Sequence, residues 1–446
     1  MMEVEWDILQ KQSGSEHFLK IYKKNQKLIA FGFFYVKKNE KEMSMQKGAQ
    51  YQAVLELITE IFKDREAADN IINTYLRNRK YIGSKDRKFI TETVWCILRN
   101  RRKLMFDTQS TEPRRILLYF LKDKDFDVIC SDSPYSLEPL TKEEKLWLKQ
   151  ENEEPYPSAV EAETPDWLYA KIHDMDLLKS LNKPASADLR INALNRDLII
   201  KKLQGEGLFF RATKYSPIGI RSDERINLHN CMSYQEGEVE VQDEASQIAS
   251  ILAEVSPEHK TIDFCCGAGG KTLTIAYLNN NQGQIDVHDI NWGRLEAIKD
   301  RAKRLKISNI NIVKELKDDD YERFIVDAPC SGSGTWRRSP DAKFRLTETQ
   351  LAELNKTQRE ILEVAYAHTK RGGRIIYFTC SILPDENENI IKSFCAYHSD
   401  IKQVNLKQIW EQKLNGHYPV VDEYLLHLNP LISGTDGFFI SILEKQ

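Results

Sequence analysis

The sequence lacks several features that would place it in a specialised class of protein. Its 446 residues include eight cysteines, but no CxxC pair and no Cys/His spacing typical of a zinc site. The apolar run from Leu28 to Val36 is much shorter than the roughly 20 residues that a membrane helix needs. The formal net charge of -3 argues against a protein that coats nucleic acid over its whole surface. We therefore expect no metal site, no redox dithiol and no membrane span.

A secretion signal is also missing near the N-terminus. Small residues should follow an apolar signal core, but Lys37 and Lys38 stand there instead. We expect a monomer in the reducing cytoplasm, and a strand or buried segment at 27–38. Because Met43 and Met45 directly precede the first helical pattern, residues 1–45 are either an N-terminal extension or a start-site artefact.

The composition, 41% hydrophobic and 29% charged, is typical of a soluble protein with several domains. Apolar residues recur at three- and four-residue steps through 46–130, which predicts a small all-helical domain. Between 77 and 103, ten basic residues stand against two acidic ones. Such a cluster is either an RNA-binding surface or a solvated helix face. The ten are Arg77, Arg79, Lys80, Lys85, Arg87, Lys88, Arg99, Arg101, Arg102 and Lys103.

Three further segments follow the helical one. Residues 131–185 are rich in acid and proline and predict a helical linker. Short alternating runs separated by Gly, Asn and Asp predict a small α/β subdomain at 186–240. From 241 to 446, apolar strand patterns alternate with helical ones, which indicates a doubly wound α/β domain.

Two cysteines in this last domain each follow an apolar strand pattern. Cys330 ends FIVDAPC and Cys380 ends GGRIIYFTC. In an open α/β sheet the carboxyl ends of the strands form the ligand crevice, so both thiols are expected to face one pocket. The rival interpretation is that both are small buried core residues, as free cysteines usually are.

A glycine-rich turn lies in KTIDFCCGAGGKTL, between a predicted strand and a predicted helix. A phosphate-binding Walker loop would need glycine where Cys265 stands, and a dinucleotide fingerprint would need it where Thr272 stands. The next predicted strand ends at Asp289, where a carboxylate is well placed to accept hydrogen bonds from ribose hydroxyls. The turn and this acid together favour a ribose-bearing cofactor, although Asp289 alone could cap the following helix.

The ordered motifs resemble those of the Sun/Fmu family of RNA 5-methylcytosine methyltransferases. They are DFCCGAGGKT, Asp289, DAPCSGSGTWRRSPD, GGRIIYFTCSILPDENE and GTDGFF. The N-terminal helical pattern is similar to the NusB-like RNA-binding domain of the bacterial 16S rRNA cytosine methyltransferase B group. The resemblance implies a Rossmann-like, S-adenosylmethionine-dependent methyltransferase core behind a NusB-like domain and a small α/β subdomain. It also implies RNA, here 16S rRNA, as the partner.

The resemblance further implies which residues hold S-adenosylmethionine. They are the turn, Asp289, an acid after the third strand at Glu315, and Asp327 of DAPC. Ala268 stands where the family more often has proline, and Glu315 where aspartate is more usual, which places the cofactor affinity in doubt. The residues of the turn are Cys265, Cys266, Gly267, Ala268, Gly269, Gly270 and Lys271.

Catalytic roles follow from the same resemblance and from cytosine chemistry. Carbon 5 becomes nucleophilic only after something adds to carbon 6, and a thiolate is a suitable adduct former. Following the family pattern, Cys380 is the nucleophile and Cys330 assists release, directly or through water. Asp327 is expected to hold the cytosine edge. Lys271 either orients the base or lowers a thiol pKa; the plainer alternative is that it only caps the turn.

The segment after DAPC suggests a rim for the pocket. Trp336, Arg337 and Arg338 suit base stacking and phosphate contact; the plainer alternative is a buried Trp with two surface arginines.

Three rival functions remain to be compared. A noncatalytic RNA-binding module with a degenerate methyltransferase fold would leave the thiols and the glycine turn unused. A nicotinamide dehydrogenase has the wrong glycine spacing. A thiol oxidoreductase would normally carry its second cysteine close in sequence.

Overall fold

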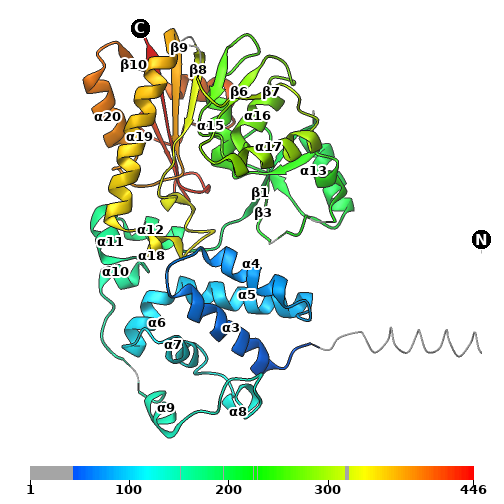
Figure 1. Ribbon diagram of the computed structural model, residues 1–446, viewed down its shortest axis with the longest axis vertical. Coiled ribbons are helices and arrows are strands. Elements are labelled where there is room, and N and C mark those ends of the chain that lie inside the picture. Colours follow the sequence, from blue (N-terminus) through cyan, green and yellow to red (C-terminus); the bar gives the residue numbers. More distant parts are fainter. Residues whose placement is uncertain (1–43, 151, 194, 225, 229, 317–320) are drawn as a thin grey trace, which may run out of the picture.

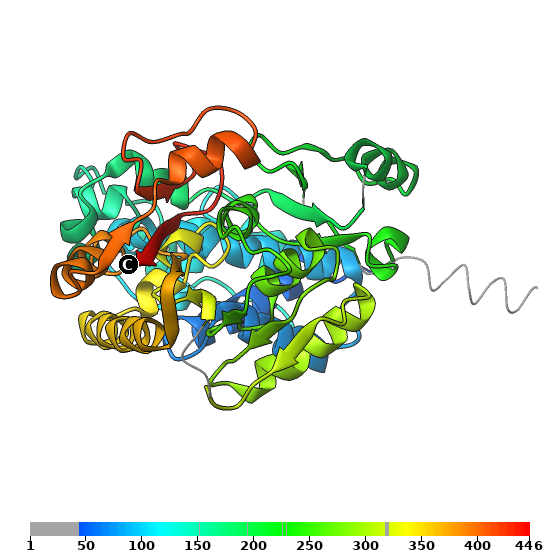
Figure 2. The same ribbon diagram turned by 90° about the horizontal axis from the view of Figure 1, so that it is seen from above.

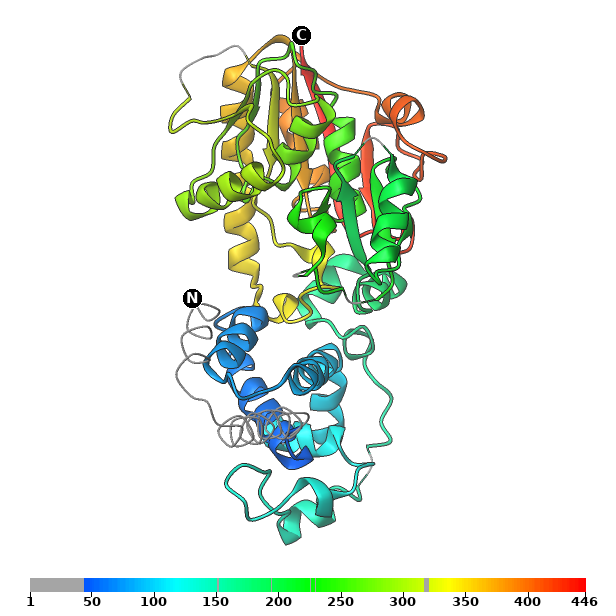
Figure 3. The same cartoon turned by 90° about the vertical axis from the view of Figure 1, so that its right-hand side faces the viewer.

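The computed structural model describes residues 44–150, 152–193, 195–224, 226–228, 230–316 and 321–446. The expected strand or buried segment at 27–38 lies outside these residues. A helical region lies below a larger α/β part, and a connecting segment runs along one side between them (Figures 1 and 3). None of the helices in the described ranges is long and apolar enough to cross a membrane.

The helical region buries one apolar stripe from each of its longer helices. On the first helix, Val54, Leu57, Ile58 and Ile61 recur at helical spacing and are all buried. They share one hydrophobic core with the neighbouring helices. The helices are α3 (Lys47–Ile61), α4 (Ala68–Asn78), α5 (Ser84–Arg99), α6 (Arg101–Thr108), α7 (Pro113–Phe120) and α8 (Phe126–Ile129).

The connecting segment holds short helices that pack at the junction of the two parts. Leu168, Leu178 and Leu181 are buried there against Trp336 of the α/β part. The helices are α9 (Lys142–Trp147), α10 (Ser158–Glu161), α11 (Asp166–Ile172) and α12 (Met175–Leu181).

A small antiparallel sheet follows, with the strand order β2-β3-β1-β4. Its apolar face packs against short helices in a separate core that includes Leu189, Ile220 and Leu203. The elements are β1 (Ala187–Ile191), α13 (Arg196–Gly205), β2 (Arg211–Ala212), β3 (Gly219–Ser222), α14 (Met232–Gln235) and β4 (Val239–Val241).

The main sheet has the order β10-β12-β9-β8-β5-β6-β7, and β11 also pairs with β12. The pairs from β9 to β7 are parallel and β12 is antiparallel. This arrangement confirms the predicted Rossmann-like fold class. The strands are β5 (Thr261–Asp263), β6 (Ile285–Val287), β7 (Ile310–Ile312), β8 (Tyr321–Asp327), β9 (Thr369–Thr379), β10 (Ile401–Gln403), β11 (Leu425–Leu428) and β12 (Phe438–Lys445).

Helices cover both faces of this sheet, because alternate residues of each central strand point to opposite sides. In β8, Phe324 and Val326 join one core while Ile325 joins the other. Figure 1 shows α19 and α20 on one side and α15, α16 and α17 on the other, and α21 packs against α15 (Figure 2). The helices are α15 (Glu244–Leu252), α16 (Gly270–Leu278), α17 (Trp292–Arg304), α18 (Ala342–Arg345), α19 (Glu348–His368), α20 (Glu388–Tyr397) and α21 (Leu406–Lys413).

Candidate active site

The two predicted cysteines lie side by side at one edge of the main sheet. β8 and β9 are parallel neighbours, so the turns that follow them meet at the same edge. The sulfur atoms of Cys330 and Cys380 are 3.4 Å apart, too far for a disulfide. The hydrogen bond with Cys380, together with burial, raises the pKa of the Cys330 thiol well above its ordinary value.

A buried carboxylate, Glu386, ties the two cysteine turns together. Its Oε1 accepts the backbone N–H of Ser331 at 2.8 Å, and its Oε2 accepts the hydroxyls of Ser331 and Ser381, each at 2.5 Å. Each serine directly follows one of the two cysteines. Gln358 of α19 donates to the same carboxylate at 3.1 Å. Glu386 was not selected from the sequence, where its only signal is an acid shortly after Cys380.

Lys271 and Asp327 form an ion pair at the same edge. The Lys271 Nζ lies 2.6 Å from the Oδ2 of Asp327, which is the last residue of β8. Burial lowers the pKa of Lys271, but the charges of Asp327 and Cys380 outweigh burial, so the pKa is raised overall. The ammonium is therefore held in its charged form beside the thiol pair.

The backbone of the glycine turn is open on one side and closely packed on the other. Gly267 has a φ of 55°, and a Cβ at this position would meet no described atom within 4 Å, so the backbone faces open space. Gly269 has a φ of 79°, and a Cβ there would lie 2.0 Å from Ile298 Cγ1. The first glycine thus leaves room for a ligand, while the second allows α17 to pack against the turn.

Asp289 holds the turn in place from the end of the neighbouring strand. Its Oδ2 accepts the N–H of Gly267 at 2.8 Å, and its Oδ1 accepts the N–H of Asn291 at 2.7 Å. The N-cap of α17 is Asn291, whose side chain accepts the N–H of Gly293. Asp289 is therefore not the helix cap. It lies beside the open face of the turn, where its remaining lone pairs can accept ribose hydroxyls.

A second acid, Asp263, lies under the turn and was not selected from the sequence. Its Oδ2 accepts the hydroxyl of Thr272 at 2.6 Å, whereas its buried Oδ1 has no hydrogen-bond partner among the described residues. Burial raises the pKa of this carboxyl to about 7. A buried acceptor without a partner, next to a turn that faces open space, also fits a site for a polar ligand.

Other residues of the turn are engaged by the protein itself. The side chain of Cys266 packs in the core, and burial raises the pKa of Cys265 well above its ordinary value. The carbonyl of Ala268 accepts a hydrogen bond from Arg301, and that of Gly270 accepts one from Gln242. For these four residues the structure shows structural contacts, and a role in cofactor binding stays a prediction.

Glu315 stands apart from this cluster. It is exposed, three residues past the end of β7, and makes no hydrogen bond or ion pair with any residue that the structure describes. Its predicted contact with the cofactor therefore stays a prediction.

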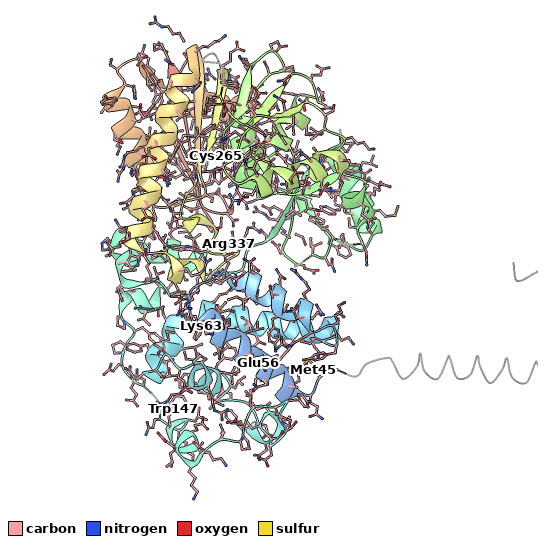
Figure 4. The ribbon with its side chains drawn as sticks, in the orientation of Figure 1. Met45, Glu56, Lys63, Trp147, Cys265 and Arg337 are labelled. Carbon is pink, nitrogen blue, oxygen red and sulfur yellow. The ribbon has the colours of Figure 1, made fainter. Side chains whose placement is uncertain are left out.

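The predicted stacking role of Trp336 is wrong, because its ring is 1% exposed and belongs to the core at the junction. The plainer alternative is closer to the structure, although the arginines are also engaged. Arg337 donates to the carbonyls of Pro184 and Thr435, and Arg338 forms ion pairs with Asp243 and Asp436. Both guanidinium groups hold loops together, and Figure 4 shows Arg337 at the boundary between the two parts of the molecule.

The basic cluster of the helical region divides into two groups, six side chains that the protein itself engages and four that are exposed. In the first group, Arg79 pairs with Glu56, and Arg87 donates to the carbonyls of Ile82 and Arg79. Arg99 donates to the carbonyls of Asn182 and Arg337, at 2.8 and 2.6 Å, and Arg101 pairs with Asp64. Arg102 and Lys103 form ion pairs with acids of the connecting segment. Four others, Arg77, Lys80, Lys85 and Lys88, are exposed on and between α4 and α5. Only this second group fits an RNA-binding surface.

A cavity of about 520 Å³ opens beside Cys330 and Ser331. It gives a polar ligand access to the cysteine turns from the side of the helical region. Among the described residues, no group of three His, Cys, Asp or Glu side chains is placed to hold a metal ion.

Comparisons with known proteins show which family the α/β part is similar to. Residues 249–444 match the family model described as 16S rRNA methyltransferase RsmB/F. The chain is 28% identical over 306 residues to the probable ribosomal RNA small subunit methyltransferase B of Bacillus subtilis strain 168, covering 65% of this chain and 68% of that protein. It is 32% identical over 303 residues to the probable enzyme of the same name from Synechocystis, covering 63% of this chain and 66% of that protein.

Solved structures show the same fold. The crystal structure of PH0851 matches with a TM-score of 0.74 at 22% identity, covering 91% of this chain and all of that one, 100%. The structure of NSun6 from Pyrococcus horikoshii with SFG matches with a TM-score of 0.55 at 19% identity, covering 63% of this chain and 97% of that one. Residues 249–444 therefore belong to the RsmB/F methyltransferases, the S-adenosylmethionine-dependent Sun/Fmu family that the motifs indicated.

Proposed function

We propose that this protein transfers the methyl group of S-adenosylmethionine to carbon 5 of a cytosine in RNA, with small-subunit ribosomal RNA as the substrate. The observation that carries the proposal is the pair of thiols 3.4 Å apart beside the Lys271–Asp327 ion pair. The names of the relatives support ribosomal RNA as the substrate class. Such a substrate also implies the cytoplasm as the site of action.

In this proposal Cys380 is the nucleophile. Its thiolate adds to carbon 6 of the cytosine, so a carbon–sulfur bond forms and negative charge moves onto the ring. The charge of the thiolate interacts with the Lys271 ammonium, which lies at the same edge of the sheet. Asp327, oriented by Lys271, holds the ring edge. The proton that nitrogen 3 gains comes from the Lys271 ammonium through this carboxyl, and it returns by the same route after methyl transfer. The bound S-adenosylmethionine supplies the methyl group to the activated carbon 5.

Cys330 is assigned to the release step. Before attack, its thiol faces the sulfur of Cys380, and this neighbour is the main reason that the pKa of Cys330 is raised. Once Cys380 becomes a neutral thioether, that cause disappears, and Cys330 can lose its proton to solvent through the adjoining cavity. Its thiolate, directly or through water, then takes the proton from carbon 5. The carbon–sulfur bond breaks and Cys380 leaves as a thiolate.

The glycine turn and Asp289 are assigned to the cofactor. The open space in front of Gly267 admits the ligand, and the carboxylate of Asp289 accepts its ribose hydroxyls. Because carbon 6 of a stacked cytosine is covered on both faces, the target nucleotide lies in a loop or is turned out of its helix.

A methylation assay tests the proposal. The protein is incubated with S-adenosylmethionine and an unmodified transcript of small-subunit ribosomal RNA, and bisulfite sequencing then locates 5-methylcytosine. We expect one protected cytosine, absent with Cys380→Ser. A methyl group on another atom, or RNA binding with no binding of S-adenosylmethionine in calorimetry, would contradict the proposal. The latter result would favour a noncatalytic RNA-binding module.

A further inference from the structure

The cavity beside Cys330 is built by both parts of the molecule. Cys330 and Ser331 form one wall, α18 and α19 form another, and Asp64 and Arg65 reach it from the loop between α3 and α4. Figure 4 labels Lys63, just before this loop, in the helical region below Arg337. A loop of the helical region therefore lies at the entrance to the candidate catalytic turns.

One anchor of this loop is the pair of Asp64 and Arg101. Two guanidinium nitrogens of Arg101 bind the two carboxylate oxygens of Asp64, at 2.8 and 3.0 Å. The same guanidinium lies over the rings of Phe62 and Phe344, with its carbon 4.5 and 4.6 Å from their centroids. Phe344 belongs to α18, so the loop is fixed against the α/β part and the charge of Asp64 is neutralised.

The second anchor is the buried carboxylate of Asp341. Its Oδ2 accepts the backbone N–H of Ala68, at the start of α4, at 3.1 Å. The same oxygen accepts the Nε of Arg345 at 3.0 Å. The two terminal nitrogens of Arg345 make no hydrogen bond with any described residue, and this side chain lines the cavity. Asp341 thus holds the loop close to Arg345, whose terminal N–H groups remain available as donors.

The side chain of Arg65, in the same loop, takes part in neither anchor. It is exposed, lines the cavity, and makes no hydrogen bond or ion pair with any part of the chain that the structure describes. Two guanidinium groups, one from each part of the molecule, therefore offer N–H donors to the space that contains Cys330. Glu353 lines the same cavity, and its carboxylate forms no ion pair with any described residue.

We propose that Arg65 and Arg345 together bind a backbone phosphate of the RNA strand next to the target nucleotide. A guanidinium fork matches two phosphate oxygens, and phosphate contacts set the position of a strand without reading its sequence. The helical region then supplies part of the substrate site itself. This inference rests on the proposed RNA substrate.

The test compares single variants of the full chain on an unmodified small-subunit ribosomal RNA transcript. Arg65→Ala is expected to raise KM about 5- to 20-fold and to leave kcat within about twofold, because the lost contact positions the strand in the ground state. It is also expected to lower the salt slope of RNA binding by about 0.7 to 0.9. Its Tm is expected to match the wild type, since Arg65 has no described partner.

One further variant is a matched control, and another is a second test. Lys63→Ala removes the same charge two residues away, but Lys63 pairs with Glu60 and does not line the cavity, so KM should not change. Glu353→Gln removes the repulsion of a phosphate and should lower KM. The inference is overturned if Arg65→Ala behaves like Lys63→Ala, or if Glu353→Gln raises KM. If the wild type neither binds nor methylates the transcript, the proposed function itself fails.

Discussion

The α/β part and the helical part use their charged side chains in different ways. Around the thiols, the ion pair of Lys271 and Asp327 and the carboxylate of Glu386 contact residues of the catalytic turns themselves. In the helical part, Arg99 and Arg101 bind groups that hold the loops or the two parts together. Charge in the first region therefore lies at the proposed site of chemistry, while six of the ten basic residues of the cluster in the second hold the fold together.

The largest effect is expected where charge lies beside the proposed nucleophile. Lys271→Ala removes the ammonium that pairs with Asp327 and interacts with the charge of Cys380. We expect kcat to fall by about 10²- to 10³-fold, the range of a positioned acid–base or charged group. Steady-state methylation kinetics measure this. The exposed Lys299→Ala, which loses only a surface ion pair with Glu296, should leave kcat unchanged.

The buried acid under the glycine turn should make stability depend on pH. The pKa of Asp263 is raised to about 7 from 3.8, so across this interval the folded protein holds a proton that the unfolded chain has lost. The protonated Asp263 contributes fully to the free energy of unfolding below pH 3.8, and this contribution is lost as pH rises through about 7. In urea unfolding, the free energy of unfolding should fall between about pH 4 and pH 8 for the wild type. For Asp263→Asn this fall should be smaller by roughly 2 to 4 kcal/mol. Equal pH dependence would contradict this.

A substitution of Glu386 can show whether this residue positions the cysteine turns for catalysis or only stabilises the fold. Glu386→Gln replaces an acceptor oxygen by a donor between the turns of the two cysteines. We expect kcat to fall about 10- to 100-fold. Because the charge of Glu386 also helps to raise the pKa of Cys330, the rate of Cys330 alkylation in a Cys380→Ser background should rise at lower pH. An unchanged alkylation profile would leave only a structural role. The neighbouring Asp385→Asn serves as the control.

The smallest effects are expected in the basic cluster of the helical part, where some substitutions should change stability and others RNA binding. Arg99→Ala loses hydrogen bonds to two backbone carbonyls and should lower the free energy of unfolding by about 1 to 3 kcal/mol. The exposed Arg77→Ala should change stability by less than about 0.5 kcal/mol, yet lower the salt slope of RNA binding by about 0.7 to 0.9. If Arg77→Ala lowered stability and Arg99→Ala changed only RNA binding, the distinction between structural and RNA-binding charges would be wrong.

The sequence predicted those features that depend on order along the chain. Cys330 and Cys380 could be placed at one edge because each follows an apolar strand pattern, and the carboxyl ends of parallel strands meet. The glycine turn could be placed because it lies between a strand and a helix. The contact of Lys271 with Asp327 spans 56 positions, so only the tertiary structure reveals it.

Other features depend on partners that the local sequence does not identify. Trp336 is buried because Leu168 and Leu178 arrive from the connecting segment, which itself looked like a linker. Glu386 resembles an ordinary surface acid until two serines from different turns converge on it. Arg99 looks like its exposed neighbours until its carbonyl partners are in place. A run of basic residues in the sequence therefore does not show which of them bind RNA and which hold the fold together.

Covalent trapping on RNA tests the division of labour between the two thiols most directly. Each single Cys→Ala variant is incubated with S-adenosylmethionine and labelled small-subunit ribosomal RNA transcript, and the products are separated on a denaturing gel. Cys330→Ala should form a stable protein–RNA adduct, because Cys380 still attacks but release is blocked. Cys380→Ala should form none and should not methylate. Adduct formation by Cys380→Ala, or by neither variant, would contradict the assignment.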